Sequence, residues 1–265
     1  MQKTLPSCWL AACTALSTAC ASGRAPQDVS APPLSTDRPG LLFAPTLVPA
    51  GHLQLEASTP VWIESESGAT RSTSWSAPIA LRHGLGERVE LRATLPAWTE
   101  QRVEHAGATE RDEGFADMEL GLKLALRAPD DEPLALLTML RLPSGADAFA
   151  ADGVGASAYL LHGRTHGSLA FSGLAGLVHT PLADADDATQ GVLGVLVARG
   201  LTTSTSATLE LVAMPGLVHA PGQAFVGAAL LQLIGSDLQL DLALDVGLDP
   251  DAPDLVLSLG FARRF

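Results

Sequence analysis

The side chains best suited to acid–base or metal chemistry are seven histidines, and their spacing gives them few partners. A hydrolase or acyltransferase needs a histidine beside a serine with a carboxylate behind it, and His166 next to Ser168 is the nearest candidate. The sequence contains no Gly-x-Ser-x-Gly motif, and no two histidines at metal-ligand spacing have an adjacent acid. We therefore predict no catalytic site and no cofactor, and keep a lipid hydrolase or acyltransferase as an alternative.

Two acidic stretches carry oxygen ligands of the kind that calcium prefers. They are DADDATQ, residues 184–190, and LDPDAPDL, residues 248–255. Neither has the spacing of a known calcium loop, whereas Asp and Pro are typical of solvated turns. We predict turns here and no metal site.

The remaining charged residues occupy alternate positions within apolar segments. In SDLQLDLALDVG, residues 236–247, aliphatic side chains alternate with polar ones, and three of the polar ones are aspartates. Successive side chains on a strand point to opposite faces, so this stretch predicts a strand with one aliphatic face and one acidic face. The same rule places eleven charged residues on the polar faces of their strands: Glu56, Arg82, Glu90, Arg92, Asp117, Glu119, Lys123, Arg141, Glu210, Asp241 and Asp245.

About twelve such segments are predicted, each about ten residues long. They lie near 51–63, 73–82, 87–98, 114–127, 133–142, 155–164, 167–178, 190–199, 203–214, 223–234, 237–247 and 254–265, and those between 155 and 199 alternate poorly. Connections after odd-numbered segments are long, including 64–72 and 99–113, and those after even-numbered segments are mostly short. Long loops at one end and short turns at the other are typical of a spanning β-barrel.

Alternation alone does not show which way the leucines point. A soluble β-sandwich buries its apolar faces, whereas a barrel in lipid turns them outward. Charges of both signs on most strands, the even strand number and the terminal Phe265 favour the barrel. We predict an all-β fold, a closed antiparallel up-and-down transmembrane β-barrel of about 12 strands over residues 51–265. A soluble periplasmic sandwich or lipoprotein that binds a ligand remains an alternative.

The N-terminus has the layout of an export signal. Lys3 precedes an apolar run from residue 8 to 21 that ends in small residues, so we predict a signal peptide over 1–21. All three cysteines lie within it, and Cys13 or Cys20 as a lipidation site is a rival interpretation. Export together with a barrel predicts the outer membrane of a Gram-negative bacterium, with its lipid, its assembly machinery acting through Phe265, and a small-molecule solute as partners.

Composition and charge exclude two classes of protein. The formal net charge is −13 over 265 residues and no basic stripe interrupts the acidity, so nucleic acid is not a partner. Outside the signal, no run of 18 apolar residues occurs, which excludes a membrane protein built of helices.

Residues 22–50 are rich in Pro, Ser and Ala and predict an irregular leader. Its motif STDRPG contains Asp37 and Arg38, which we expect either to enter the barrel as a partial plug and pair with the charges inside, or to form a polar tail with a turn at residues 39–40. The inward charges themselves have two interpretations: a pore lining that filters solutes, or cross-strand pairs that fill a narrow barrel.

Several stretches resemble one family of outer-membrane barrels, the phenol-degradation (MetA-type) pathway proteins often labelled transporters. They are STDRPG at 35–40, PAGHLQLEAS at 49–58, IALRHGLGERVELR at 79–92, DMELGLKLAL at 117–126 and the terminal hairpin from 238 to 265. The resemblance implies an outer-membrane channel or transporter for small molecules, often aromatic or apolar ones. This chain has fewer Tyr and Phe than the family.

Overall fold

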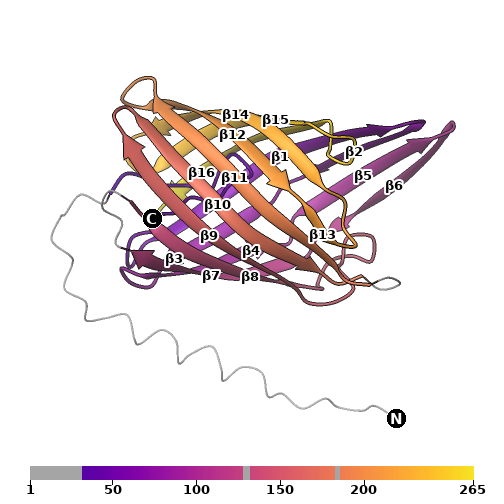
Figure 1. Ribbon diagram of the computed structural model, residues 1–265, viewed down its shortest axis with the longest axis horizontal. Helices are drawn as coiled ribbons and strands as arrows, with labels where there is room; N and C mark the ends of the chain where they lie inside the picture. The colour runs from indigo at the N-terminus through magenta and orange to yellow at the C-terminus, as the bar shows by residue number, and fades with distance from the viewer. Residues whose placement is uncertain (1–31, 128–131, 183–185) are drawn as a thin grey trace, which may run out of the picture. The chain divides into compact units, whose positions relative to one another are not determined.

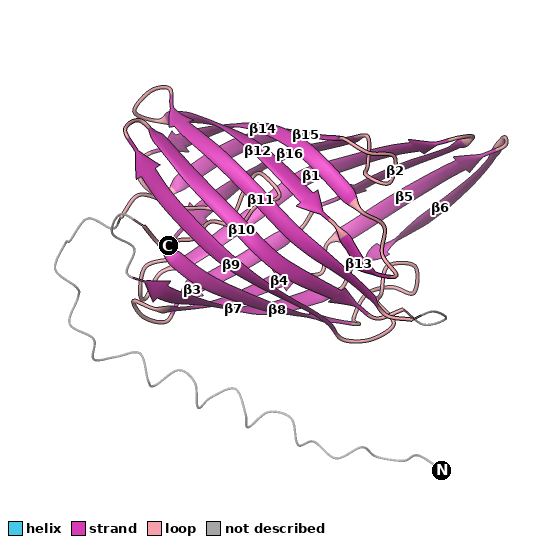
Figure 2. Ribbon diagram, in the orientation of Figure 1, coloured by secondary structure: helices cyan, strands magenta, loops and turns pink. Residues whose placement is uncertain are grey.

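A computed structural model describes residues 32–127, 132–182 and 186–265 of the chain. The expected signal peptide, its cysteines and residues 22–31 of the expected leader lie outside the described residues. The folded unit runs from Pro33 to Phe265 and is built of β-strands (Figures 1 and 2). No helix in the described part of the chain is long and apolar enough to cross a membrane.

The strands are consecutive along the chain and most are joined as hairpins. Their bounds are β1 Leu53–Ser67, β2 Thr70–Ser76, β3 Ile79–Gly84, β4 Val89–Leu95, β5 Trp98–His105, β6 Ala108–Phe115, β7 Met118–Arg127, β8 Leu134–Leu142, β9 Gly155–His166, β10 Leu169–Thr180, β11 Ala188–Gly200, β12 Thr205–Met214, β13 Gly216–Val218, β14 Gln223–Ile234, β15 Leu238–Gly247 and β16 Leu255–Arg264.

These strands form one closed antiparallel sheet. β1 pairs with β3 on one side and with β16 on the other, and the Leu55↔Arg263 register joins the two ends of the chain. Three strands of the barrel are each divided in two by a short interruption: β2 with β3, β4 with β5, and β6 with β7. The short β13 continues the line of β12 along β11. The ring therefore contains 12 strands, which confirms the predicted barrel. The sandwich alternative is wrong, because there is one closed sheet and not two stacked ones.

Strand β15 shows how the two faces of the barrel strands are used. On β15, Leu242 and Leu244 are 45% and 43% exposed on the outer surface, whereas Asp241 and Asp245 are 3% and 2% exposed and face the interior. Leucines and valines of the other barrel strands are exposed in the same way, so the outside is an aliphatic band. A shift of register by one residue would put carboxylates into that band.

The connections differ at the two ends of the barrel. Tight turns at 85–88, 167–168, 201–204 and 235–237 lie at the end where β1 begins and β16 finishes. At the other end, the connections at 143–154, 181–187, 215–222 and 248–254 are longer. This is the expected asymmetry for the second half of the chain.

Two of the expected long loops, 64–72 and 99–113, are strand instead. β1 with β2, and β5 with β6, run on beyond the other strands as hairpins with two-residue turns, and they project at the right of Figure 1. The prediction was wrong because the residues of these extensions are polar on both faces, which leaves no hydrophobic alternation to read. Pro78 and Pro96 sit at the interruptions, where a residue without an N–H ends the ladder.

The outward leucines predict a specific sensitivity to charge. Replacement of Leu242 by Arg, in the middle of β15, should lower the free energy of unfolding in lipid vesicles by about 2–4 kcal/mol. Urea titration of the vesicle-embedded protein measures this change. The matched control is Leu248→Arg in the β15–β16 connection, which should have little effect. Equal losses in the two variants would contradict an apolar band around β15.

Candidate functional site

The interior of the barrel is occupied by a segment of the chain's own N-terminal region. Residues 33–50, here called the leader segment, are indigo in Figure 1 and contact side chains from both sides of the ring. The backbone N–H of Val48 donates to Glu90 Oε2 at 2.8 Å, and that of Leu41 donates to Glu210 Oε1 at 2.8 Å. Wall carboxylates thus satisfy backbone donors of an irregular segment, which would be unpaired if buried alone.

One side of the interior carries an excess of cations. Arg82 of β3 is fully buried and makes paired contacts with Glu90, from Nε to Oε1 at 2.9 Å and from Nη2 to Oε2 at 3.0 Å. Its Nη1 reaches Glu56 Oε1 at 2.7 Å. Arg92 and Lys123 lie on the adjoining strands β4 and β7. We name five residues the basic wall: the cations Arg82, Arg92 and Lys123 and the carboxylates Glu56 and Glu90.

Asp37 of the leader segment supplies the missing negative charge. Its carboxylate forms an ion pair with Arg92 and lies 3.3 Å from Lys123 Nζ and 3.5 Å from Arg82 Nη1. Burial by itself would raise the pKa of Asp37, but the two guanidiniums and the ammonium hold that pKa below its usual range. Asp37 therefore stays ionised and completes a neutral cluster of three cations and three anions.

Arg38 points to the opposite side, where the wall is acidic. Its Nη2 is 2.8 Å from Asp241 Oδ1 of β15 and donates to Ser258 Oγ of β16 at 3.1 Å, while Nη1 donates to Ser58 Oγ of β1. Gly260 makes room for it, because a Cβ there would lie 2.4 Å from Arg38 Nη2. Two consecutive residues of opposite charge thus bridge walls of opposite charge.

Glu210 and Asp245 extend the acidic side. They lie on β12 and β15, one on each side of Gly227 of β14, and both are buried. Gly227 has no side chain to separate them, since a Cβ would lie 1.9 Å from Asp245 Oδ1. No cation of the described residues forms an ion pair with either carboxyl group, so this side keeps a negative excess even with Arg38 docked.

Three of the sequence-predicted residues lie toward the end with the longer connections. Asp117 does not pair with a cation: it accepts backbone N–H bonds from Ser144, Gly145 and Ala151 at 3.0, 2.9 and 2.8 Å, and so holds the β8–β9 connection folded. Glu119 and Arg141 pair with each other across β7 and β8 at 3.1 Å. Their side chains line a cavity.

The other half of the interior is apolar, which the sequence did not reveal. Inward side chains of β8 to β12 form a cluster with Leu42 of the leader segment, and Phe43 and Leu47 pack against it. The wall members of this cluster are Ala135, Leu137, Met139, Leu161, Leu174, Val192 and Val212. Gly194 admits the leader here, because a Cβ there would lie 2.2 Å from Leu42 Cδ2. The leader segment is held by charge on one side and by hydrophobic contact on the other.

The other chemical candidates are not assembled into sites. His166 and Ser168 are exposed at a tight turn, and neither has a carboxylate within hydrogen-bond distance among the described residues. Residues 183–185 of the first acidic stretch lie outside the described residues, and in the second Asp249 Oδ1 caps a turn through the N–H of Asp251 at 3.1 Å. Within the described residues, no group of three or more His, Cys, Asp or Glu is placed to hold a metal ion.

Comparison with solved structures gives the class of the fold. An outer membrane channel from Pseudomonas putida F1 superposes with a TM-score of 0.64 at 15% identity, covering 86% of this chain and 99% of that one. The translocator domain of the autotransporter NalP from Neisseria meningitidis gives 0.58 at 12%, covering 82% and 90%, and the NanC porin gives 0.54 at 8%, covering 80% and 98%. No family model and no curated protein matches the sequence.

These likenesses show the fold: the chain is a closed 12-stranded antiparallel barrel of the kind found in bacterial outer-membrane proteins. The resemblance to phenol-degradation pathway proteins is not confirmed at the level of a named family. The similar structures include channels, a porin and translocator domains, so the fold alone does not select a solute.

The geometry of Asp37 predicts that one neutral substitution will loosen the leader segment. Asp37→Asn leaves the basic wall with an uncompensated cation, and removing one partner of a buried pair typically costs on the order of 3–5 kcal/mol. Since about 1.4 kcal/mol is a factor of ten, we expect chymotrypsin to cut after Phe43, which packs against the inner wall when the segment is docked, at least tenfold faster in the folded barrel. Asp112→Asn, on the exposed hairpin β5–β6, is the control and should cut at the wild-type rate. Unchanged cutting in Asp37→Asn would disprove the role of this carboxylate as an anchor.

Proposed function

We propose that this chain is an outer-membrane channel for small molecules and that the leader segment is its gate. The proposal rests on one observation above all: Asp37 and Arg38 occupy the interior between the basic wall and the acidic side, where a solute would pass. With the leader segment docked, the charged half of the interior is filled. With it displaced, Glu56, Arg82, Glu90, Arg92, Lys123, Glu210, Asp241 and Asp245 become a wet lining that selects by size and sign.

Location and orientation follow from the aliphatic outer surface and the positions of the chain ends. The exposed leucines suit contact with outer-membrane lipid. The short turns, the start of β1 and the end of β16 all lie at one end of the barrel, and this end suits the periplasmic side. The leader segment then enters from the periplasm after removal of a signal peptide. Phe265, exposed at the end of the last strand, is the element offered to the assembly machinery of a Gram-negative outer membrane.

The gate proposal predicts a change in conductance. A variant that lacks residues 33–48 should show larger single-channel conductance in planar lipid bilayers than the intact chain, because the ion pairs that fill the interior are removed. Residues 49–52 are kept, since Gly51 N–H donates to Gly84 O at 2.8 Å and anchors β1. A difference in gel mobility between unheated and heated samples verifies that the variant is folded.

A second deletion of similar kind provides the control. Removal of residues 103–104 and 109–110 shortens the β5–β6 hairpin outside the ring and should leave conductance as it is in the intact chain. If the leader deletion conducts no better than the intact chain while remaining folded, the channel proposal is wrong and a structural role replaces it.

A further inference from the structure

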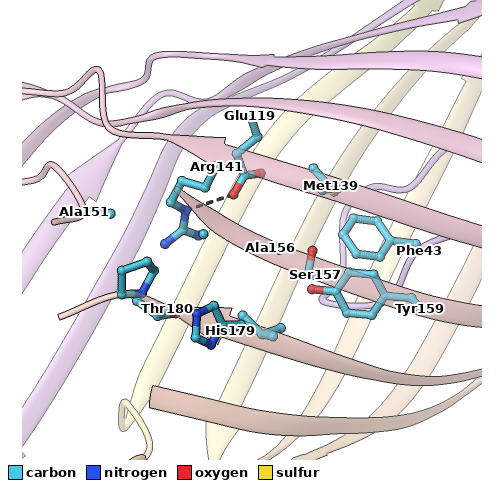
Figure 3. A pocket seen from close by; sticks show the side chains of 13 residues that line it. Phe43, Glu119, Met139, Arg141, Ala151, Ala156, Ser157, Tyr159, His179 and Thr180 are labelled. Atoms are coloured by element: carbon cyan, nitrogen blue, oxygen red, sulfur yellow. Dashed lines mark hydrogen bonds and ion pairs between the residues drawn. The ribbon is translucent and has the colours of Figure 1, made fainter. Parts of the chain in front are cut away.

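A cavity of about 230 Å³ lies inside the barrel between the leader segment and the longer connections (Figure 3). Its base is Phe43 of the leader segment, and its opposite limit is formed by Ala151 and Pro181, at the ends of the β8–β9 and β10–β11 connections. It adjoins the Asp37 cluster through Phe43, whose ring centroid lies 5.2 Å from the guanidinium carbon of Arg92, but no residue of that cluster lines it. A solute that enters from the long-loop end meets this cavity before it meets Asp37 and Arg38.

One side of the cavity is built for a flat apolar group. Phe43 and Tyr159 stand edge to face, with centroids 5.2 Å apart and planes at 60°, and Met139 and Val178 complete this side. Aromatic rings prefer such offset and perpendicular neighbours, so a third ring is well accommodated beside the pair. Drug-sized pockets measure roughly 300–1,000 Å³, so this smaller cavity suits a single ring with a short substituent.

The other side presents hydrogen-bond donors that the protein leaves unused. Arg141 Nε donates to Glu119 Oε1 at 3.1 Å, and the two terminal nitrogens of Arg141 have no partner among the described residues. Figure 3 shows those nitrogens turned from Glu119 toward Thr180. His179, with Nε2 3.4 Å from Asp187 Oδ2, and the Ser157 hydroxyl add further polar groups nearby.

The arrangement favours an anion over a cation. The Arg141 side chain is 47% exposed and that of Glu119 25%, so the guanidinium is the more accessible charge and its Nη pair is free. A guanidinium fork matches a carboxylate in plane and spacing, and the match is lost with a neutral hydroxyl. A ring on Phe43 and Tyr159 and a carboxylate on Arg141 fit opposite sides of one small cavity.

We propose that this cavity binds a small aromatic carboxylate, with the ring against Phe43 and Tyr159 and the carboxylate on the terminal nitrogens of Arg141. Only the interpretation of this cavity as an entry site for the solute rests on the proposed channel function. Binding itself depends on the cavity alone. It also gives the leader segment a second role, because Phe43 forms part of the site.

Calorimetry on the folded, detergent-solubilised full chain tests the proposal, with benzoate as the probe. Benzoate should bind at least tenfold more tightly than phenol, benzylamine or hexanoate, which lack the carboxylate, reverse the charge or lack the ring. Tighter or equal binding of phenol or benzylamine would overturn the carboxylate assignment, and equal binding of hexanoate would overturn the aromatic one. No binding of benzoate overturns the site.

Variants localise the binding. Arg141→Gln should weaken benzoate binding at least tenfold and leave the weak binding of phenol unchanged, whereas Phe43→Leu should weaken both. Arg164→Gln is the matched control, since Arg164 is exposed on the outer face of β9 and lines no part of the cavity. A benzoate affinity that is unchanged in Arg141→Gln contradicts the proposal.

The two proposals fail separately. Benzoate binding without conductance in the leader deletion would remove the channel and keep the site. Conductance without benzoate binding would remove the site and keep the channel.

Discussion

The position of the leader segment inside the barrel depends on the separation of charge across the lumen. The basic wall lacks one negative charge and the opposite side lacks positive ones, so neither is neutral by itself. Two adjacent residues of the leader segment, Asp37 and Arg38, face these two sides. Buried charge is strongly unfavourable without a partner, and both partners here come from a single dipeptide. The position of the leader segment is therefore set to within one residue, since a shift by one would bring like charges together.

Hydrophobic contact fixes the remaining freedom of the leader segment. Leu42, Phe43 and Leu47 follow the charged pair and lie against the apolar side chains of β8 to β12. The strands near 155–199 alternate poorly in the sequence for this reason: their outward residues belong to the aliphatic outer surface and many of their inward residues meet leader side chains, so both faces are apolar. The weak pattern that obscures these strands reflects the segment they enclose.

Much of the barrel could be predicted from the sequence, and the limits have physical causes. Alternation with a period of two identifies the strands and places Asp241 and Asp245 inward. Ring closure, which brings β16 beside β1, is not encoded in any local pattern, so the meeting of Arg38 with Asp241 could be expected only as one pairing among many. The extensions of β5 and β6 were missed because both of their faces are in water. The role of Asp117 was also missed, because nothing in the sequence distinguishes a carboxylate that binds backbone N–H groups from one that binds a cation.

The same interactions that dock the leader segment also limit the free energy needed to release it. Most of its polar contacts are ion pairs and hydrogen bonds to charged groups, and on leaving both partners regain water, which offsets a large part of the lost Coulomb energy. A leader held by an equal area of purely apolar contact would have no such compensation. The barrel wall is different in kind, since its strands are joined by a closed ring of backbone hydrogen bonds, and in a membrane no water replaces such bonds. A rigid wall around a solvatable segment confines any change of state to the interior, which is where a channel requires it.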